Sequence, residues 1–139
     1  MVLCVAVDDK MGMTFNRRRQ SKDALLRKKL LEISKGHRLY MNNYSAKQFE
    51  NVSDYNIVVD DEMLDKACDD DFCFVEDLPL KGYEQLINKI FIFRWNRLYP
   101  ADMFFDISLD DNNWILDSAI EFEGNSHKNI TMEKWIRYE

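Results

Sequence analysis

Residues 72–93 read FCFVEDLPLKGYEQLINKIFIF, and they carry the clearest sign of how the chain folds. Four apolar residues, Phe72 to Val75, predict a buried strand, and Lys89 to Trp95 predict a second one. Between them, Tyr83 to Asn88 are expected to form a short helix. A strand, a helix and a strand in this order favour a parallel pair joined by a crossover. The unusual feature is Glu76-Asp77, two carboxylates at the end of the first strand.

The rest of the chain repeats this alternation. Val2 to Val7 form a continuous apolar run, typical of a strand buried on both faces, and a polar loop containing Gly12 follows. A helix is expected to begin at Ser21 or Asp23 and to end at Lys35-Gly36. The remaining predicted segments are strands at His37–Met41, Tyr55–Val59, Trp114–Ser118 and Ile130–Tyr138, and helices after an N-cap at Ser45 and at Glu62–Cys68. We therefore predict one α/β domain over residues 1–139, with a mainly parallel sheet flanked by helices and an antiparallel C-terminal end.

Composition excludes several classes of protein. Apolar residues make up 46% of the 139 residues and aromatic residues 13%, as in a globular chain. The sequence contains no run of about 18 apolar residues, so no membrane span is predicted, and the N-terminus lacks the pattern of a secretory signal. The three cysteines form no CxxC pair, which favours free thiols in a reducing cytoplasm. No recognised metal-ligand spacing occurs, so we predict no metal site.

Charge is divided unevenly along the chain. Residues 1–50 hold 11 Lys/Arg and 5 Asp/Glu, whereas residues 51–139 hold 8 and 20, within a net charge of −6. The most acidic part runs from Asp54 to Asp77, and the most basic tract is Arg17 to Arg19. The basic tract could contact nucleic-acid phosphates, but a solvated loop is the favoured interpretation because the protein is acidic overall.

The order of these segments resembles the dihydrofolate reductase family along nearly the whole chain. VAVDDKMGM (5–13) resembles the family's first strand and the loop after it, and RLYMNNYSAKQF (38–49) resembles the segment that holds the cofactor's phosphates. Residues 72–93 resemble the strand, glycine-rich turn, helix and strand that follow. The remaining matches in order are YNIVV (55–59), YPADMFFD (99–106), Trp114 and NSH (125–127). The resemblance implies an eight-stranded sheet with about four helices, and a nicotinamide cofactor, NADPH, across the carboxyl ends of the strands.

The resemblance also implies a set of site residues. Asp23 falls at the family's substrate-binding carboxylate and is the candidate catalytic residue. The positions of the family's cofactor cleft are Gly12, Met13, Asn42, Asn43, Tyr44, Ser45, Val75, Glu76 and Asp77.

The chain departs from the family at these ligand positions. Glu76-Asp77 replace glycines that admit the pyrophosphate, and Asp60-Asp61 replace small hydroxyl residues near the 2′-phosphate. Asn42 to Tyr44 replace a phosphate-binding arginine, and Asp54 lies where the family grips the folate carboxylate. One clash between unit charges about 4 Å apart costs roughly 4 kcal/mol at an effective dielectric near 20. These changes predict weak binding of NADPH.

The residues also have simpler interpretations. Asp23 in the first turn of a helix interacts favourably with the helix dipole without any catalytic role. Glu76 and Asp77 are expected to cap the helix that follows them, with Pro79 in its first turn. His127 is expected to be a surface or turn residue. Ala24, Arg27 and Phe93 stand where the family's pterin pocket has other residues, so only Asp23 remains of that pocket's chemistry.

Three functions remain open. The first is a dihydrofolate-reductase-like protein that has lost the reaction and binds an unknown small molecule or protein partner, without a cofactor. The second is an oxidoreductase that uses NADPH or another reductant on dihydrofolate or another pterin-like ring, with Asp23 as the substrate-binding acid. The third is nucleic-acid association through Arg17–Arg19, which we favour least.

Overall fold

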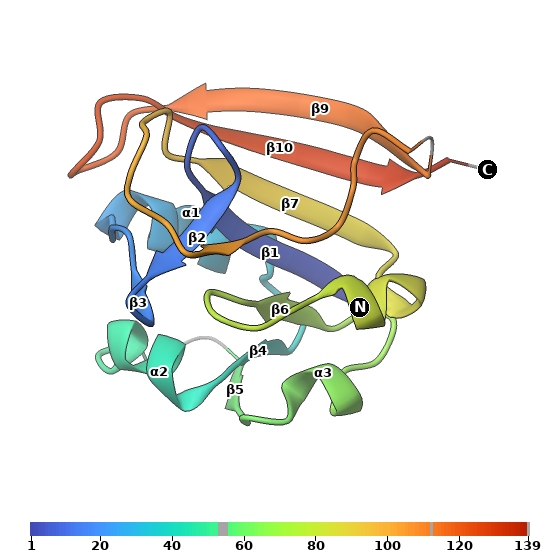
Figure 1. The fold of residues 1–139 in the computed structure, drawn as a ribbon. Helices are drawn as coiled ribbons and strands as arrows, with labels where there is room; N and C mark the ends of the chain where they lie inside the picture. The colour runs from blue at the N-terminus through green and yellow to red at the C-terminus, as the bar shows by residue number, and fades with distance from the viewer. Residues whose placement is uncertain (53–55, 112, 139) are drawn as a thin grey trace.

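The computed structural model describes residues 1–52, 56–111 and 113–138. Within them the main sheet has seven strands, which are in spatial order β5 (Ile57–Val59), β4 (Leu39–Met41), β6 (Phe72–Phe74), β1 (Val2–Val7), β7 (Lys89–Arg94), β10 (Ile130–Arg137) and β9 (Trp114–Phe122) (Figure 1). A small second sheet contains β3 (Arg18–Arg19), β2 (Gly12–Phe15) and β8 (Met103–Phe104). The helical segments are α1 (Ala24–Ile33), α2 (Asn43–Ala46), α3 (Met63–Lys66) and the 3-10 helices η1 (Lys47–Phe49) and η2 (Lys81–Leu86).

The strand directions confirm the predicted fold class. Strands β5, β4, β6, β1 and β7 run parallel to one another, whereas β10 is antiparallel to both β7 and β9. The resemblance implies eight strands, but the main sheet has seven in the described residues. Tyr55, expected to begin the strand before Asp60, and the neighbouring Asp54 lie outside the described residues.

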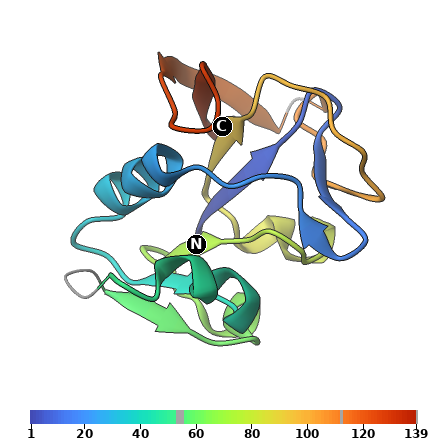
Figure 2. The same ribbon diagram turned by 90° about the vertical axis from the view of Figure 1, so that its left-hand side faces the viewer.

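Strand β1 shows why a continuous apolar run was needed. Leu3 and Val5 pack into one hydrophobic cluster, whereas Val2 and Cys4 pack into another on the opposite face of the sheet. Leu26 of α1 belongs to the second cluster. Figure 2 shows α1 on one side of the sheet and the small sheet on the other. Because both faces are covered, the loops beyond the strand ends are the natural place for a site.

The segment after β1 forms a hairpin instead of the polar loop that the sequence indicated. Phe15 of β2 pairs with Arg18 of β3 across a two-residue turn. Both turn residues, Asn16 and Arg17, have positive φ, at 50° and 61°. Such turns match the twist of a hairpin but normally use Asn-Gly. The Asn-Arg pair therefore gave no recognisable turn signal.

Two helix starts correct the sequence predictions. Asn42, and not Ser45, is the N-cap of α2, because its side chain accepts a hydrogen bond of 2.9 Å from the backbone N–H of Ser45. The segment expected as a helix at Tyr83–Asn88 is the 3-10 helix η2 at Lys81–Leu86. The first correction matters for the site, since the Ser45 hydroxyl is left for another partner.

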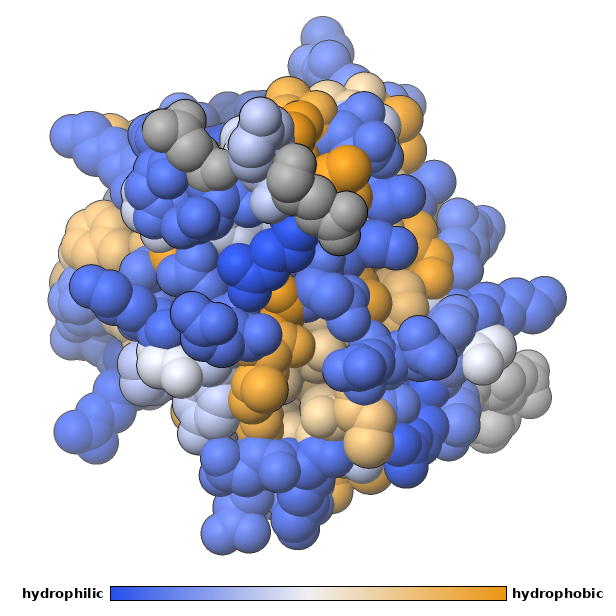
Figure 3. Space-filling model, turned by 90° about the vertical axis from the view of Figure 1, so that its right-hand side faces the viewer, coloured by the Kyte–Doolittle hydropathy of each residue, from blue (hydrophilic) through white to orange (hydrophobic). Residues whose placement is uncertain are grey.

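The surface is largely hydrophilic on the face seen in Figure 3, with a narrow apolar strip across it. No helix in the described parts of the chain is long and apolar enough to span a bilayer.

Gly124, in the loop between β9 and β10, offers a test of this packing. A Cβ there would lie 2.8 Å from the carbonyl oxygen of His127 and 2.7 Å from Cδ1 of Ile130, and would crowd a carboxylate oxygen of Asp23. We expect Gly124→Ala to lower the free energy of unfolding by about 1–3 kcal/mol, since overpacking displaces backbone. Urea denaturation measures the change.

The matched control is Gly82→Ala in η2, where nothing lies within 4 Å of an added Cβ. Its free energy of unfolding should stay within about 0.5 kcal/mol of the unaltered protein or rise slightly. Equal losses in the two variants would show that the loop after β9 is not tightly packed.

Candidate functional site

Polar side chains gather where the parallel strands end. Asp8 follows β1, Asn42 follows β4, and Glu76 lies two residues beyond β6. Their side chains belong to buried residues that are 1%, 7% and 8% exposed. Ligands of open α/β sheets bind at this edge, so it is the candidate site.

Glu76 is held by three other side chains. Its carboxylate accepts hydrogen bonds from Nε and Nη2 of Arg19, at 2.9 and 3.2 Å. It also accepts from the Ser45 hydroxyl at 2.7 Å and from Nε2 of Gln48 at 3.0 Å. The guanidinium fork and the carboxylate form a two-bond pair, the geometry that makes Arg–carboxylate contacts strong. This cluster joins the end of β6 to β3, α2 and η1.

Arg19 is itself fixed in place by Tyr44. The guanidinium carbon lies 4.3 Å from the centre of the Tyr44 ring, and the backbone N–H of Arg19 donates to the Tyr44 hydroxyl at 2.8 Å. Nη2 also donates to the Tyr44 carbonyl oxygen at 3.3 Å. The last residue of the Arg17–Arg19 tract therefore points into the protein, while Arg17 and Arg18 are exposed.

The expected helix cap at Glu76-Asp77 is wrong. The N-cap of η2 is Leu80, which has no side-chain cap, and its backbone N–H donates to the Asp106 carboxylate at 3.0 Å. Asp77 instead accepts a bond of 2.8 Å from Nδ2 of Asn42. The chain runs three more residues before η2 begins, so both carboxylates meet the residues after β4 instead of the helix.

Asp23 performs a structural task in the described geometry. It is 2% exposed and is the N-cap of α1, accepting from the backbone N–H groups of Leu25 and Leu26 at 2.9 and 3.1 Å. Its other oxygen accepts from the backbone N–H of Ser126 at 2.7 Å, from its hydroxyl at 3.0 Å, and from the N–H of His127 at 3.2 Å. Burial raises the pKa of Asp23, but the hydrogen bonds outweigh it and the pKa is lowered. Its catalytic role stays a prediction.

His127 is buried, contrary to the expectation of a surface residue. It is 8% exposed, and its ring centre lies 4.5 Å from that of Trp95. Nε2 lies 2.6 Å from the Tyr99 hydroxyl and Nδ1 lies 2.8 Å from the Ser126 hydroxyl. Burial lowers the pKa of His127, although the nearby Asp23 carboxylate acts in the opposite direction. The lowered pKa favours the neutral ring. No signal in the sequence paired Tyr99 with a histidine 28 residues away.

Asp8 organises the turn after β1. Its carboxylate accepts from the backbone N–H groups of Lys10 and Gly12, each at 2.8 Å, and from Nε2 of Gln20 at 2.9 Å. A Cβ on Gly12 would lie 2.7 Å from an Asp8 oxygen and 2.8 Å from the Gln20 amide nitrogen. The space beside this glycine is therefore filled by the protein's own side chains. Met13 is buried in the core, at 4% exposed.

The cofactor positions implied by the resemblance thus divide into separate groups. Tyr44, Ser45 and Glu76 meet around Arg19, and Asn42 meets Asp77. Asn43 bonds the Asp61 carboxylate through its backbone and side-chain nitrogens, at 2.9 and 3.0 Å. Val75 and Met13 belong to one hydrophobic cluster, and Gly12 bonds Asp8. Sequence reasoning missed Arg19, Gln48 and Gln20 as partners of these positions.

A basic pocket opens beside the Glu76 cluster, with a volume of about 260 Å³. We define this basic pocket by its lining residues, which are Arg19, Lys22, Arg27, Lys47 and Gln48. No carboxylate of the described residues lines it.

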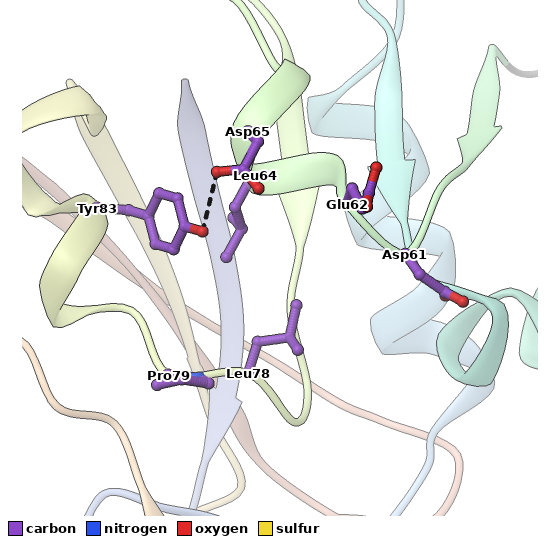
Figure 4. Close-up of a pocket in the computed structure, with 7 residues that line it drawn as sticks. All are labelled: Asp61, Glu62, Leu64, Asp65, Leu78, Pro79 and Tyr83. Atoms are coloured by element: carbon purple, nitrogen blue, oxygen red, sulfur yellow. Dashed lines mark hydrogen bonds between the residues drawn. The ribbon is translucent and has the colours of Figure 1, made fainter.

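An acidic pocket of about 240 Å³ lies between α3 and the segment after β6 (Figure 4). Asp61, Glu62 and Asp65 stand around it, and Leu78 and Tyr83 give it an apolar side. The Tyr83 hydroxyl donates to Asp65 at 3.0 Å. Hydrogen bonds from Asn43 lower the pKa of Asp61.

Metal binding has no candidate in the part of the chain that the structure describes: no group of three or more His, Cys, Asp or Glu side chains is arranged to hold an ion. The three cysteines carry free thiols, with Cys4 and Cys73 buried and Cys68 exposed.

Replacing Asp23 tests its structural task. In Asp23→Asn the amide nitrogen faces the N–H donors of Ser126 and His127, so we expect the free energy of unfolding to fall by about 1–3 kcal/mol. Because folding lowers the pKa of Asp23, the carboxylate's contribution is present above its unfolded value near pH 4 and is lost as the pH falls below it. The gap between the two proteins in urea denaturation should therefore narrow in acid.

The control is Asp117→Asn on β9, whose exposed carboxylate lies 3.6 Å from Nζ of Lys134. Such a surface pair contributes about 0–1 kcal/mol, so stability should change little at any pH. If the Asp23→Asn variant is as stable as this control, the structural role of Asp23 is contradicted.

Comparison with known proteins supports the fold and nothing finer. No protein-family model matches the chain, and no curated protein matches its sequence. Solved structures do match: dihydrofolate reductase from Enterococcus faecalis, complexed with NADP(H) and RAB-propyl, is similar with a TM-score of 0.67 and 10% sequence identity. The match covers 99% of this chain and 96% of that chain. The resemblance seen in the sequence is confirmed at the level of structure, and the protein has a divergent dihydrofolate-reductase-like fold.

Proposed function

We propose that this protein has lost NADPH-dependent folate reduction and acts as a binding or regulatory module that needs no nicotinamide cofactor. The observation that carries the proposal is the buried Glu76 carboxylate, which takes the donors of Arg19, Ser45 and Gln48. In the resembling family the matching turn admits the cofactor's pyrophosphate, and the hydroxyl at the place of Ser45 meets it. Here the protein supplies the anion itself.

The cost to an incoming phosphate is large in this arrangement. The phosphate would have to displace Glu76 from Arg19, and taking one partner from a buried ion pair costs about 3–5 kcal/mol. If Glu76 stayed, two negative charges about 4 Å apart would repel by roughly 4 kcal/mol at an effective dielectric near 20. Either cost is about a factor of a thousand in affinity.

The acidic pocket supports the same conclusion at the other end of the cleft. Asp61 is tied to Asn43, and Asp60 lies 2.7 Å from Nζ of Lys66. These aspartates stand at the family's 2′-phosphate position, where a negative side chain opposes a negative ligand. Opposition at two phosphate positions makes NADPH a poor ligand.

The two other functions receive less support. Both oxygens of Asp23 are already used by α1 and by the Ser126–His127 backbone, which leaves a pterin ring little to bind. Nucleic-acid association through Arg17–Arg19 would lose one of its three arginines to Glu76.

Titration with NADPH tests the proposal directly. At physiological salt we expect no binding tighter than about 100 μM, measured by ligand fluorescence, because Glu76 and Asp61 oppose the two phosphate ends. Oxidation of NADPH in the presence of dihydrofolate should not exceed the rate without protein. Micromolar binding, or turnover with dihydrofolate, would refute the proposal.

Removing the internal anion gives a second, gain-of-binding test. Glu76→Gln frees the Arg19 guanidinium, so the affinity for NADPH should rise at least about tenfold while the free energy of unfolding falls by about 3–5 kcal/mol. The control, Glu50→Gln, removes an equal charge from an exposed residue close in sequence to η1. An equal gain in both variants would mean that overall charge, and not the buried pair, controls affinity.

A further inference from the structure

The basic pocket gathers four cationic side chains at one hollow of an acidic protein. Arg19 ends β3, Lys22 precedes α1, Arg27 lies on α1, and Lys47 begins η1. Figure 2 looks onto this side of the molecule, where the segment joining β3 to α1 passes above α2. Like charges placed this close repel one another, so the arrangement is best satisfied when an anion enters.

Among the described residues, three of these cations have no carboxylate within ion-pair distance. Arg19 is paired with Glu76, but within residues 1–52, 56–111 and 113–138 no ion pair involves Lys22, Arg27 or Lys47. The nearest carboxylates in sequence are Asp23, which is buried and engaged by the α1 cap, and Glu50, which is exposed. The positive charge of the basic pocket is therefore available to a ligand.

Arg27 adds an independent observation. Its Nη1 is a buried nitrogen with no hydrogen-bond partner in the described part of the chain. Buried polar groups are nearly always hydrogen-bonded, and an unmet charged donor is the costliest exception. A turn of the guanidinium toward an anion in the pocket would give this donor a partner. None of the bonds that fix Arg19 or Gln48 to Glu76 would have to break.

The backbone around the pocket is already fixed. The Lys22 carbonyl oxygen lies 2.7 Å from the Ser126 hydroxyl oxygen, and the Arg27 N–H donates to the Asp23 carbonyl oxygen at 3.1 Å. Gln48 is fixed by its bond to Glu76. Because the framework is set before binding, only the cationic side-chain ends need to be ordered by a ligand.

We propose that the basic pocket binds a small phosphate-bearing ligand, with Lys22, Arg27 and Lys47 as its direct contacts. The inference deepens the proposed binding role and rests on it. A phosphate group carries up to two negative charges and accepts several hydrogen bonds, which matches arginine and lysine donors around one centre. Glu76 holds Arg19 and Gln48 as the back of the pocket and does not take part in binding.

Calorimetric titration with inorganic phosphate and then pyrophosphate, at constant ionic strength, tests the pocket. We expect one site per chain, with pyrophosphate the tighter ligand because it carries more charge. Arg27→Gln and Lys47→Gln should each weaken binding by about tenfold or more, as expected for loss of a charge-assisted contact. The control Lys28→Gln removes an exposed charge of α1 that does not line the pocket, and it should change affinity less than twofold.

Several outcomes would overturn the inference. They are no saturable phosphate or pyrophosphate binding at millimolar concentration, an equal loss in Lys28→Gln, and tighter binding of citrate than of pyrophosphate. A single-stranded oligonucleotide that binds more tightly than pyrophosphate, through Arg17 and Arg18, would also overturn it. The ligand of this surface would then be a nucleic acid.

The two proposals can fail separately, because inorganic phosphate and pyrophosphate contain no nicotinamide. If the protein binds neither pyrophosphate nor NADPH, the inference about the basic pocket is refuted, and the proposal that NADPH is not a cofactor stands. If the protein binds NADPH at micromolar concentration, the proposed function is refuted, whether or not pyrophosphate binds.

Discussion

The buried carboxylate of Glu76 is the constraint around which this end of the molecule is arranged. A carboxylate that is 8% exposed is stable only if strong donors replace the water it has lost. Those donors come from β3, α2 and η1, which are remote from β6 in the chain. The hairpin after β1 must therefore bring Arg19 across to α2, and the α2 cap must leave the Ser45 hydroxyl free.

The same rule operates at two other buried carboxylates of this edge. Asp8 collects the N–H groups of the turn after β1, and Asp23 collects those at the start of α1 together with the loop at Ser126. In each case the acceptor and its donors belong to the same chain. A ligand cleft has to keep some donors unused until the ligand arrives, and around these carboxylates the donors are already taken. At this edge a dihydrofolate-reductase-like fold is combined with buried carboxylates that bond donors of the same chain.

The sequence predicted those features that depend on local pattern. Strand β1 needs apolar residues on both faces, so its burial could be read from residues 2–7 alone. The β2–β3 turn could not be read, because Asn16 and Arg17 adopt positive φ without the usual glycine. The partners of Glu76 could not be read either, since Arg19 lies 57 residues away and the pair exists only after the sheet has formed. For the same reason the carboxylates were expected to cap the nearest helix.

The uneven charge of the chain is partly neutralised by ion pairs between its basic first part and its acidic second part. Part of the positive excess in residues 1–50 pairs with carboxylates of the acidic second part, as in Arg19–Glu76 and in Arg38–Asp71, where the closest atoms are 2.8 Å apart. Each pair joins two segments that are distant in the chain and leaves no charge for a ligand. What remains unpaired among the described residues includes Lys22, Arg27 and Lys47 of the basic pocket. This local cluster of cations attracts anions to the basic pocket of an acidic protein, because a cleft lined by charges of one sign raises the local concentration of the opposite ion.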